Sequence, residues 1–277
     1  MSRILTAAQV DAYRRDGYHF PVRVFSPDDA RELRGCLERY ERAAGAPLQG
    51  KWRVKSHLLF TWADRIVHEP RVLDAVEDLI GPDILCWTTN FFIKEAGSPG
   101  FVSWHQDAAY WGLDPEEVVT AWVALSPANL ESGCMKVLPG SHAESHLPHV
   151  DTFAADNLLT RGQEIAVEVD EARTVAMPLA PGEMSLHHIR LVHGSAPNHS
   201  RDRRIGLAIR YLPTRVRQTK GRDSAMLVRG ADQYGHFDLE PRPREDLGEA
   251  ERQAHADAVD RKLAVLYQGT DKTQLRA

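Results

Sequence analysis

Short apolar runs in the middle of the chain limit its fold more than any other feature. The runs are rich in β-branched and aromatic residues, and Gly, Pro, Ser and Asn separate them, which is typical of short strands joined by turns. Because no helical pattern lies between the runs, they favour an antiparallel sandwich or barrel over a parallel sheet. The predicted strands span residues 84–93, 118–125, 135–138, 165–169, 183–188 and 205–212.

Helix start and stop signals flank these strands. Thr6 and Gln9 form a capping-box pair, and Ser26 stands before Pro27 as an N-cap residue before a proline at the first helical position. A third helix is predicted from Pro70 to Ile80 and ends before Gly81, because glycine commonly terminates helices. The expected fold class is therefore mainly β with flanking α-helices.

The chain of 277 residues is interpreted as one domain, residues 1–277, because we find neither an internal repeat nor a low-complexity linker. Residues 1–80 are predicted to be helical and residues 84–212 to form the β-rich core. Residues 213–248 are predicted to be irregular. A C-terminal helix is expected over residues 249–267, with an apolar stripe that packs on the rest of the protein.

Composition argues against several classes of function. Lys plus Arg total 34 and Asp plus Glu total 39, a formal net charge of −5, whereas a nucleic-acid binder usually carries a basic excess. No run of 18 apolar residues occurs, so we predict no membrane association and a cytoplasmic protein. Cys36, Cys86 and Cys134 form no Cys-x-x-Cys pair, so reduced, mostly buried thiols are expected. The oligomeric state stays open.

The most informative motif is Trp-His-Gln-Asp, which contains His105 and Asp107. Residues i and i+2 of a strand project to the same face, so this imidazole and carboxylate can reach one metal ion. A third ligand must come from another strand, and we favour His193 over its neighbours His187 and His188 because His193 precedes Gly-Ser. Two histidines and one carboxylate form the facial triad of non-haem Fe(II) oxygenases.

An arginine at a fixed distance from His193 strengthens this interpretation. Arg204 lies eleven residues after His193 and opens the run IGLAIRYLP, which we expect to form a strand beside the one that carries His193. From there a guanidinium group could hold a carboxylate with two parallel hydrogen bonds, as a dicarboxylate cosubstrate requires.

Three stretches carry a resemblance to a known family: WHQD, AWVALSPANLESGCMKVLPGSH and PGEMSLHHIRLVHGSAPNHSRDRR. They resemble the phytanoyl-CoA dioxygenase family of Fe(II)- and 2-oxoglutarate-dependent oxygenases. The resemblance is strong over residues 84–212 and looser over the N-terminal helices. It implies a double-stranded β-helix, the jelly-roll fold that cupins also have.

The resemblance also implies roles for individual residues. By this resemblance the metal ligands are His105, Asp107 and His193. The residues that it places at the cosubstrate are Arg204, Ser195 of the His-Gly-Ser motif, Lys94 on the strand before the metal motif and Trp122 on the strand after it.

The activity implied by the resemblance is that of a dioxygenase using Fe(II), 2-oxoglutarate and O2. We expect it to hydroxylate an unactivated C–H bond of a small molecule, with succinate and CO2 as coproducts. In related halogenases a small residue replaces the carboxylate ligand, so Asp107 disfavours halogenation.

Two other kinds of function stay open at this point. Desaturation, cyclisation and epimerisation would use the same residues, and the sequence does not separate them or identify the substrate. A non-catalytic cupin-like protein could keep the sheet and a metal without turnover, although the complete triad and Arg204 argue against it.

Five residues are candidates for substrate contact. Trp104, Tyr110 and Trp111 flank the metal motif, and they either wall an apolar pocket or pack the mouth of the barrel. Lys55 and His57 lie in the otherwise apolar segment KSHLLFTW, which we expect to fold over the entrance.

Overall fold

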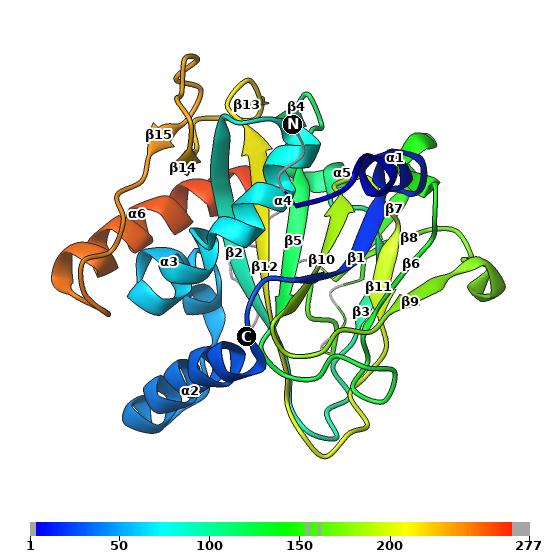
Figure 1. Ribbon diagram of the computed structural model, residues 1–277, viewed down its shortest axis with the longest axis horizontal. Helices are drawn as coiled ribbons and strands as arrows, with labels where there is room; N and C mark the ends of the chain where they lie inside the picture. The colour runs from blue at the N-terminus through cyan, green and yellow to red at the C-terminus, as the bar shows by residue number, and fades with distance from the viewer. Residues whose placement is uncertain (1–3, 153, 155, 160–161, 268–277) are drawn as a thin grey trace.

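Two sheets face each other, and helices cover the outer face of the larger sheet (Figure 1). The structure is a computed structural model that describes residues 4–152, 154, 156–159 and 162–267. The predicted class, mainly β with flanking α-helices, is confirmed.

The larger sheet runs through the centre of the molecule and has seven strands in the described part of the chain. Neighbouring strands pair antiparallel, except for a short parallel pair at one edge. In order across the sheet, the strands are β1 (Tyr18–Arg23), β10 (Glu183–His188), β5 (Val119–Ala124), β12 (Arg204–Pro213), β2 (Ile84–Lys94), β14 (Ser224–Arg229) and β15 (Asp238–Leu239).

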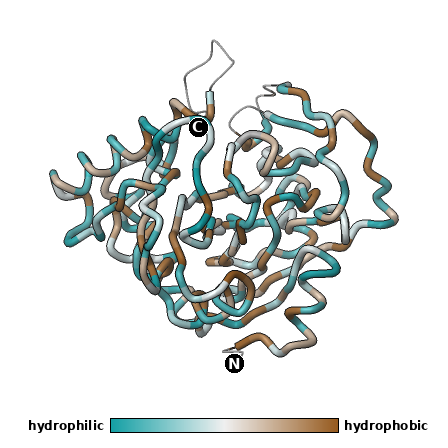
Figure 2. The backbone as a smooth tube through the Cα atoms, turned by 90° about the horizontal axis from the view of Figure 1, so that it is seen from above, coloured by the Kyte–Doolittle hydropathy of each residue, from teal (hydrophilic) through white to brown (hydrophobic). Residues whose placement is uncertain are grey.

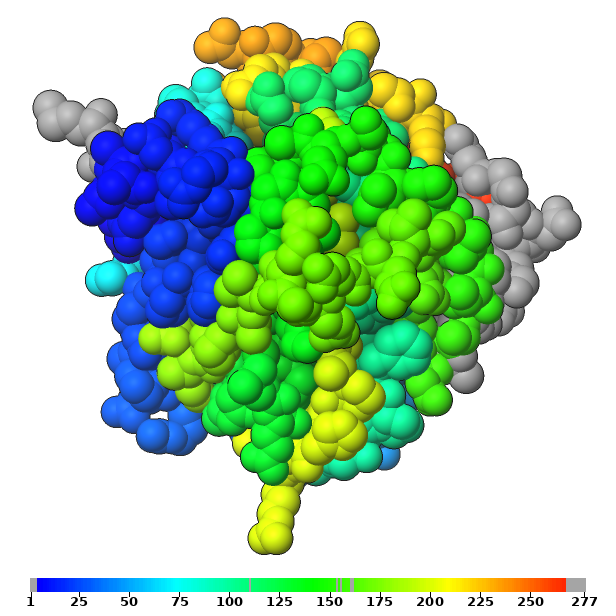
Figure 3. Space-filling view, turned by 90° about the vertical axis from the view of Figure 1, so that its right-hand side faces the viewer, coloured from blue at the N-terminus to red at the C-terminus, as the bar shows by residue number. Residues whose placement is uncertain are grey.

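The smaller sheet lies opposite the larger one. Figure 3 shows this side of the molecule, where green and yellow-green segments cover much of the surface. Its strands are β3 (Val102–His105), β11 (His193–Ser195), β6 (Met135–Val137) and β9 (Val175–Met177), in that order. Two further antiparallel pairs join β13 (Arg217–Gln218) to β4 (Leu113–Asp114) and β7 (His149–Asp151) to β8 (Gln163–Ile165).

The helices begin and end close to their predicted signals. Thr6 caps the first helix through the expected capping box with Gln9, and Ser26 caps the second. The α-helices are α1 (Ala7–Asp16), α2 (Pro27–Ala44), α3 (Thr61–Val67), α4 (Pro70–Ile80), α5 (Ala108–Trp111) and α6 (Glu249–Leu266). Short 3-10 helices are η1 (Gly50–Arg53), η2 (Ser56–Leu58), η3 (Ser141–Ala143) and η4 (Glu171–Arg173).

Strand β12 shows how the larger sheet divides its two faces. All of its residues are buried, and successive side chains point to opposite faces. Ile205 and Leu207 belong to the hydrophobic core shared with the helices, whereas Arg204 and Arg210 line the cavity between the sheets. A central strand buried on both sides therefore presents charge on one face only.

Several strands lie where the sequence pattern predicted none. β1 lies within the part expected to be helical, and β13, β14 and β15 lie within residues 213–248, which were expected to be irregular. β1 is an edge strand containing Pro21, and proline weakens the sequence signal of a strand because it is tolerated mainly at edges.

Hydrophobic and hydrophilic positions alternate over short distances along the whole backbone (Figure 2). Among the described residues, no helix combines the length and apolar character needed to cross a bilayer.

Candidate active site

Three predicted metal ligands come together at the end of the smaller sheet. His105 is the last residue of β3, and antiparallel pairing places His193 of β11 directly opposite it. Asp107 follows β3 and has a helical backbone conformation at the start of α5. The carboxylate therefore reaches the site through this turn, and not through the continuous strand that the sequence suggested.

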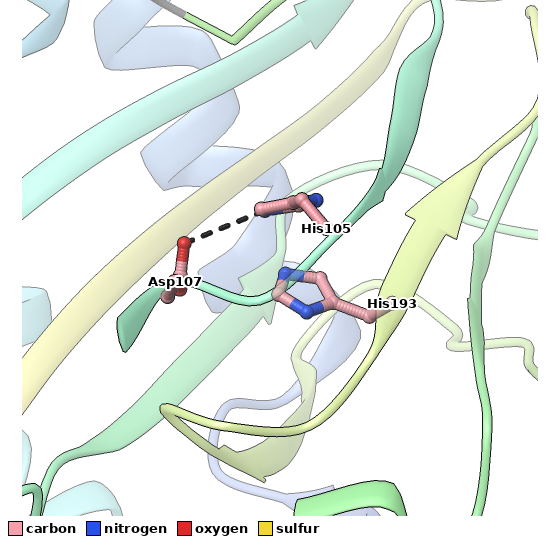
Figure 4. Close-up of side chains that lie close together, drawn as sticks. All are labelled: His105, Asp107 and His193. Atoms are coloured by element: carbon pink, nitrogen blue, oxygen red, sulfur yellow. Dashed lines mark ion pairs between the residues drawn. The ribbon is translucent and has the colours of Figure 1, made fainter. Parts of the chain in front are cut away.

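The three side chains point toward one another (Figure 4). One potential ligand atom from each lies within 4.8 Å of those from the other two, and His105 Nε2 is 3.4 Å from Asp107 Oδ1. The Nδ1 atoms of His105 and His193 each lie 2.9 Å from a backbone carbonyl oxygen. These hydrogen bonds fix both rings so that each Nε2 is left for a metal ion.

The electrostatics of the cluster also fit a divalent cation. All three residues are buried, and Asp107 Oδ2 has no hydrogen-bond partner in the described structure. Burial raises the pKa of Asp107, but the hydrogen bond to His105 and the charge of His193 outweigh this effect. The pKa of Asp107 is therefore well below its usual value. Burial and His105 lower the pKa of His193 to about 4. An ionised carboxylate and a neutral imidazole are the forms that bind metals.

Arg204 points into the same cavity from the opposite sheet. Its strand β12 pairs with β2 and β5 and not with β11, so the predicted pairing beside the His193 strand is wrong. The guanidinium group is buried, donates from Nη1 to the Gly133 carbonyl at 2.6 Å and has an unpartnered Nε. Its central carbon lies 5.3 Å from the centre of the Trp122 ring.

Lys94 lies directly across the sheet from Arg204 and gives this end of the cavity a second cation. Its ammonium group donates to Ser195 Oγ at 2.7 Å and to backbone carbonyls of Ser195 and Ala196. Burial and the charge of Arg204 lower the pKa of Lys94 to about 6. Two adjacent buried cations without a carboxylate within ion-pair distance in the described structure form a site suited to an anion.

Residues from both sheets line the cavity that joins these groups. Gly206 allows the Trp122 ring to lie against β12, because a Cβ at Gly206 would be only 1.9 Å from that ring. The lining residues are Phe92, Val102, His105, Thr120, Trp122, Met135, His187, His193, Gly194, Ser195, Arg204, Ala208 and Arg210.

The aromatic residues near the metal motif have different positions. Trp111 is buried, packs against Trp87 with ring centres 5.0 Å apart and ring planes tilted by 57°, and lines a second pocket together with Asp107. Trp104 is half-buried and is not among the residues that line either pocket. The backbone of Tyr110 lies in α5, but its side chain falls outside the described structure.

The expected contact of Lys55 and His57 with the substrate is wrong. Both are fully buried and belong to an ionic cluster with Glu240. Lys55 also donates to the carbonyls of Trp87 and Ser224, and neither residue lines the pockets described above. Glu240 neutralises the Lys55 ammonium inside the protein, so this cluster joins distant parts of the chain and does not form an entrance.

Two cavity residues were not assigned a role from the sequence. His187 is buried, its ring centre lies 4.7 Å from that of His193, and its Nδ1 has no partner in the described chain. It is nevertheless outside the group of close ligand atoms. Arg210 has no carboxylate within ion-pair distance in the described structure and could have been found by alternation, because it shares a strand face with Arg204.

The sequence matches a known family over most of its length. The family model for phytanoyl-CoA dioxygenase (PhyH) matches residues 2–206. A probable alpha-ketoglutarate-dependent hypophosphite dioxygenase of Stutzerimonas stutzeri is 30% identical over 178 residues, which cover 62% of this chain and 61% of that protein. Human peroxisomal phytanoyl-CoA dioxygenase is 30% identical over 148 residues, 51% of this chain and 43% of the relative.

The chain therefore spans about two fifths to three fifths of these relatives' lengths. Solved structures cover more of it. The apo structure of ThoJ, a non-heme monooxygenase, is 40% identical, with a TM-score of 0.84 over 94% of this chain and 98% of that chain. CytC3 with Fe(II) and alpha-ketoglutarate has a TM-score of 0.66 at 24% identity, over 88% of this chain and 96% of that one, a likeness of fold alone.

These matches agree with the arrangement of buried histidines, carboxylate and cations in the cavity. The expected relationship to 2-oxoglutarate-dependent dioxygenases is confirmed at the level of the family. The chain belongs to the phytanoyl-CoA dioxygenase (PhyH) family.

Proposed function

We propose that the protein is an Fe(II)- and 2-oxoglutarate-dependent dioxygenase that hydroxylates an unactivated C–H bond of a small molecule. The observation that carries this proposal is the convergence of His105, Asp107 and His193 on one side of a cavity whose opposite wall holds Arg204. When bound, Fe(II) and 2-oxoglutarate supply the oxidising power by activating O2, with succinate and CO2 as coproducts.

The chain's own residues fix the geometry of the metal. His105 and His193 present Nε2 because their Nδ1 atoms are held by backbone carbonyls, and Asp107 supplies a negative charge that the ion would neutralise. Three protein ligands leave further coordination positions for the cosubstrate and O2. The unpartnered Oδ2 of Asp107 is explained if a metal ion is its partner.

Arg204 and Lys94 would hold the distal carboxylate of 2-oxoglutarate. The guanidinium offers a planar pair of donors, and Ser195 holds the Lys94 ammonium beside it. The Trp122 ring lies beside the Arg204 group, which is buried away from solvent. Exclusion of water strengthens the attraction between these cations and the carboxylate.

We also propose that the two facing sheets form a jelly roll and that residues 1–277 act as one domain. The strand order and the shared cavity support this proposal. Strands on both sides of the cavity hold the metal-binding side chains rigidly, although these side chains come from different parts of the sequence. A cytoplasmic location stays a prediction.

The test is release of succinate from 2-oxoglutarate by the purified protein with Fe(II), ascorbate and O2, screened against small metabolites. The proposal predicts turnover that a substrate stimulates, that D107A abolishes, and that adds one oxygen atom from 18O2 to the product. A product two hydrogens lighter would indicate desaturation, and an isomer would indicate epimerisation. Binding of metal and 2-oxoglutarate without any succinate would favour the non-catalytic alternative.

A further inference from the structure

A second pocket opens on the other side of the metal cluster, between the larger sheet and α6. Asp107, Trp111 and Arg210 line it on the side of the metal, and Phe92 and Arg210 line both this pocket and the first cavity. From α6, Val259, Lys262, Leu263 and Leu266 line the opposite side. This second pocket is mostly apolar but contains two cations.

Arg210 is buried without an anionic partner. It is 7% exposed, and its Nε has no hydrogen-bond partner among the described residues. Within the same part of the chain, the guanidinium makes one hydrogen bond, a 3.5 Å contact with the Ala208 carbonyl. The guanidinium lies close to two rings, with its central carbon 5.4 Å from the centre of Trp111 and 5.6 Å from that of Phe92. These rings hold the group in place and leave its donors available.

The second cation comes from the C-terminal helix. Lys262 Nζ lies 3.4 Å from the centre of the Trp87 ring, and no carboxylate in the described chain lies within ion-pair distance of it. The charges of Asp223 and Asp107 act on it from further away. Asp223 is already bound by the Trp87 indole N–H at 2.7 Å.

Asp107 does not account for Arg210. No ion pair within 4 Å links the two in the described structure, although the negative charge of Asp107 acts on Arg210. A metal ion would also neutralise that carboxylate. Keeping a buried guanidinium without an anion is costly, and such groups gather at functional sites.

Strand β12 places its two arginines at opposite ends of the cavities. Arg210 follows Arg204 by six positions, about 20 Å along a strand, and both point to the same face. Across the sheet, Lys94 lies opposite Arg204 and Thr88 lies opposite Arg210. One row of side chains therefore carries a cationic group at each end.

From this arrangement, and resting on the proposed function, we propose that the substrate is an apolar molecule with a terminal carboxylate, which Arg210 and Lys262 bind. The rings of Trp111 and Phe92 and the leucines of α6 would contact its apolar body. Asp107 lines the same pocket, so a carboxylate held at Arg210 places the carbon chain beside the metal.

The test measures binding of carboxylates against their uncharged primary amides by ligand-observed NMR. The protein is loaded with Zn(II), which binds oxygen and nitrogen ligands without redox turnover, and with saturating 2-oxoglutarate so that the Arg204 end is filled. The probes are pentanoate, octanoate and 4-phenylbutanoate with the matching amides. We expect at least one carboxylate to bind about tenfold more tightly than its amide, as one charge-assisted hydrogen bond would give.

Variants show whether Arg210 binds the carboxylate of the substrate or that of 2-oxoglutarate. R210Q should remove the preference for carboxylate over amide, and R210K should retain part of it, while calorimetry shows 2-oxoglutarate affinity within twofold of the unaltered protein. K262Q, on a partly exposed helix face, should reduce the preference about threefold. R261Q is the matched control, because Arg261 lies on the same helix but pairs with Asp238, and it should change nothing.

Two results would overturn the proposal. One is that no carboxylate in the set binds more tightly than its amide. The other is that R210Q weakens 2-oxoglutarate as much as R204Q does while the carboxylate preference persists, which would assign Arg210 to the cosubstrate. Failure of the proposed function would look different: 2-oxoglutarate would not bind the metal-loaded protein, and the carboxylate preference would still be measurable without it.

Discussion

Two groups of buried charged residues in this protein differ in how they are partnered. The Lys55–His57–Glu240 cluster is internally neutralised: Lys55 contacts Glu240 and two carbonyls, and His57 Nε2 faces Glu240 at 3.5 Å. The cavity between the sheets instead holds two buried guanidinium groups, Arg204 and Arg210, neither of which has a carboxylate within ion-pair distance in the described structure. Burial of charge is common to both groups, so the lack of a counter-charge for the two arginines, and not burial, marks the binding site.

This difference has a physical basis. A buried charge must recover the solvation energy that it loses, either from neighbours in the protein or from a ligand. The first group recovers it within the fold and stabilises the attachment of the C-terminal segment. The second group leaves it to be recovered by metal and cosubstrate, which implies that ligand binding stabilises the folded state.

The largest expected effect comes from the metal ligands. D107A should lower metal-dependent succinate formation by about 10³-fold or more, as removal of a member of a cooperative catalytic set does. The measurement is succinate released from 2-oxoglutarate at saturating Fe(II). Retention of full turnover in a folded D107A protein would contradict the assignment of the triad.

A variant of Glu240 tests the Lys55–His57–Glu240 cluster. E240A should lower the free energy of unfolding by about 3–5 kcal/mol, because it leaves Lys55 buried without a counter-charge, and urea denaturation measures the change. E32A, at an exposed position, is the control and should leave stability nearly unchanged. If E240A instead abolished 2-oxoglutarate binding in the folded protein, the two groups would not be functionally distinct.

Arg204 should determine affinity for the cosubstrate. R204Q should raise the dissociation constant for 2-oxoglutarate about 100-fold, since charge-assisted hydrogen bonds contribute about 1.5–3 kcal/mol each. R204K should have a smaller effect because a lysine lacks the planar fork. Calorimetric titration of the Zn(II)-loaded protein measures both changes, and unaltered zinc affinity shows that the triad is intact.

Lys94 should make cosubstrate binding depend on pH. Its pKa is lowered to about 6 by burial and by Arg204, and a bound dianion would raise it. Below pH 6 the ammonium is protonated in both states, so affinity should be greatest and flat. As pH rises above 6 the free protein loses the proton, and affinity should fall by at most about tenfold per pH unit.

Calorimetry over pH 5.5–8 measures this dependence, and K94M is the control because it removes the titrating group. A wild-type affinity that does not change with pH over this range would contradict the assignment of Lys94 to the cosubstrate.

Ser195 should give the smallest effect. S195A removes the 2.7 Å hydrogen bond to Lys94, a contribution of about 1 kcal/mol, and should weaken 2-oxoglutarate about fivefold. The remaining carbonyl contacts still hold the ammonium group. A loss as large as that of R204Q would mean that Ser195 contacts the cosubstrate itself.

The sequence was sufficient to predict local features. It was insufficient to predict which residues distant in the chain contact each other. Caps such as Thr6–Gln9, the His-x-Asp spacing of His105 and Asp107, and the Gly-Ser that follows His193 are short-range patterns. They led to the capped helices and to three side chains that converge. The role of Lys55 was misjudged because its partner Glu240 lies 185 residues away. For the same reason, the sequence did not show that the Arg204 strand pairs with β2 and β5, because pairing of distant strands leaves no local signal.

The most direct test of the site is an anaerobic titration of Fe(II) into the protein with 2-oxoglutarate, followed by visible absorption. If the triad and Arg204 bind both groups together, a charge-transfer band between Fe(II) and 2-oxoglutarate should grow and saturate at one equivalent of metal, and D107A should abolish it. Absence of the band at saturating Fe(II) and 2-oxoglutarate in the unaltered, folded protein would contradict the proposed site.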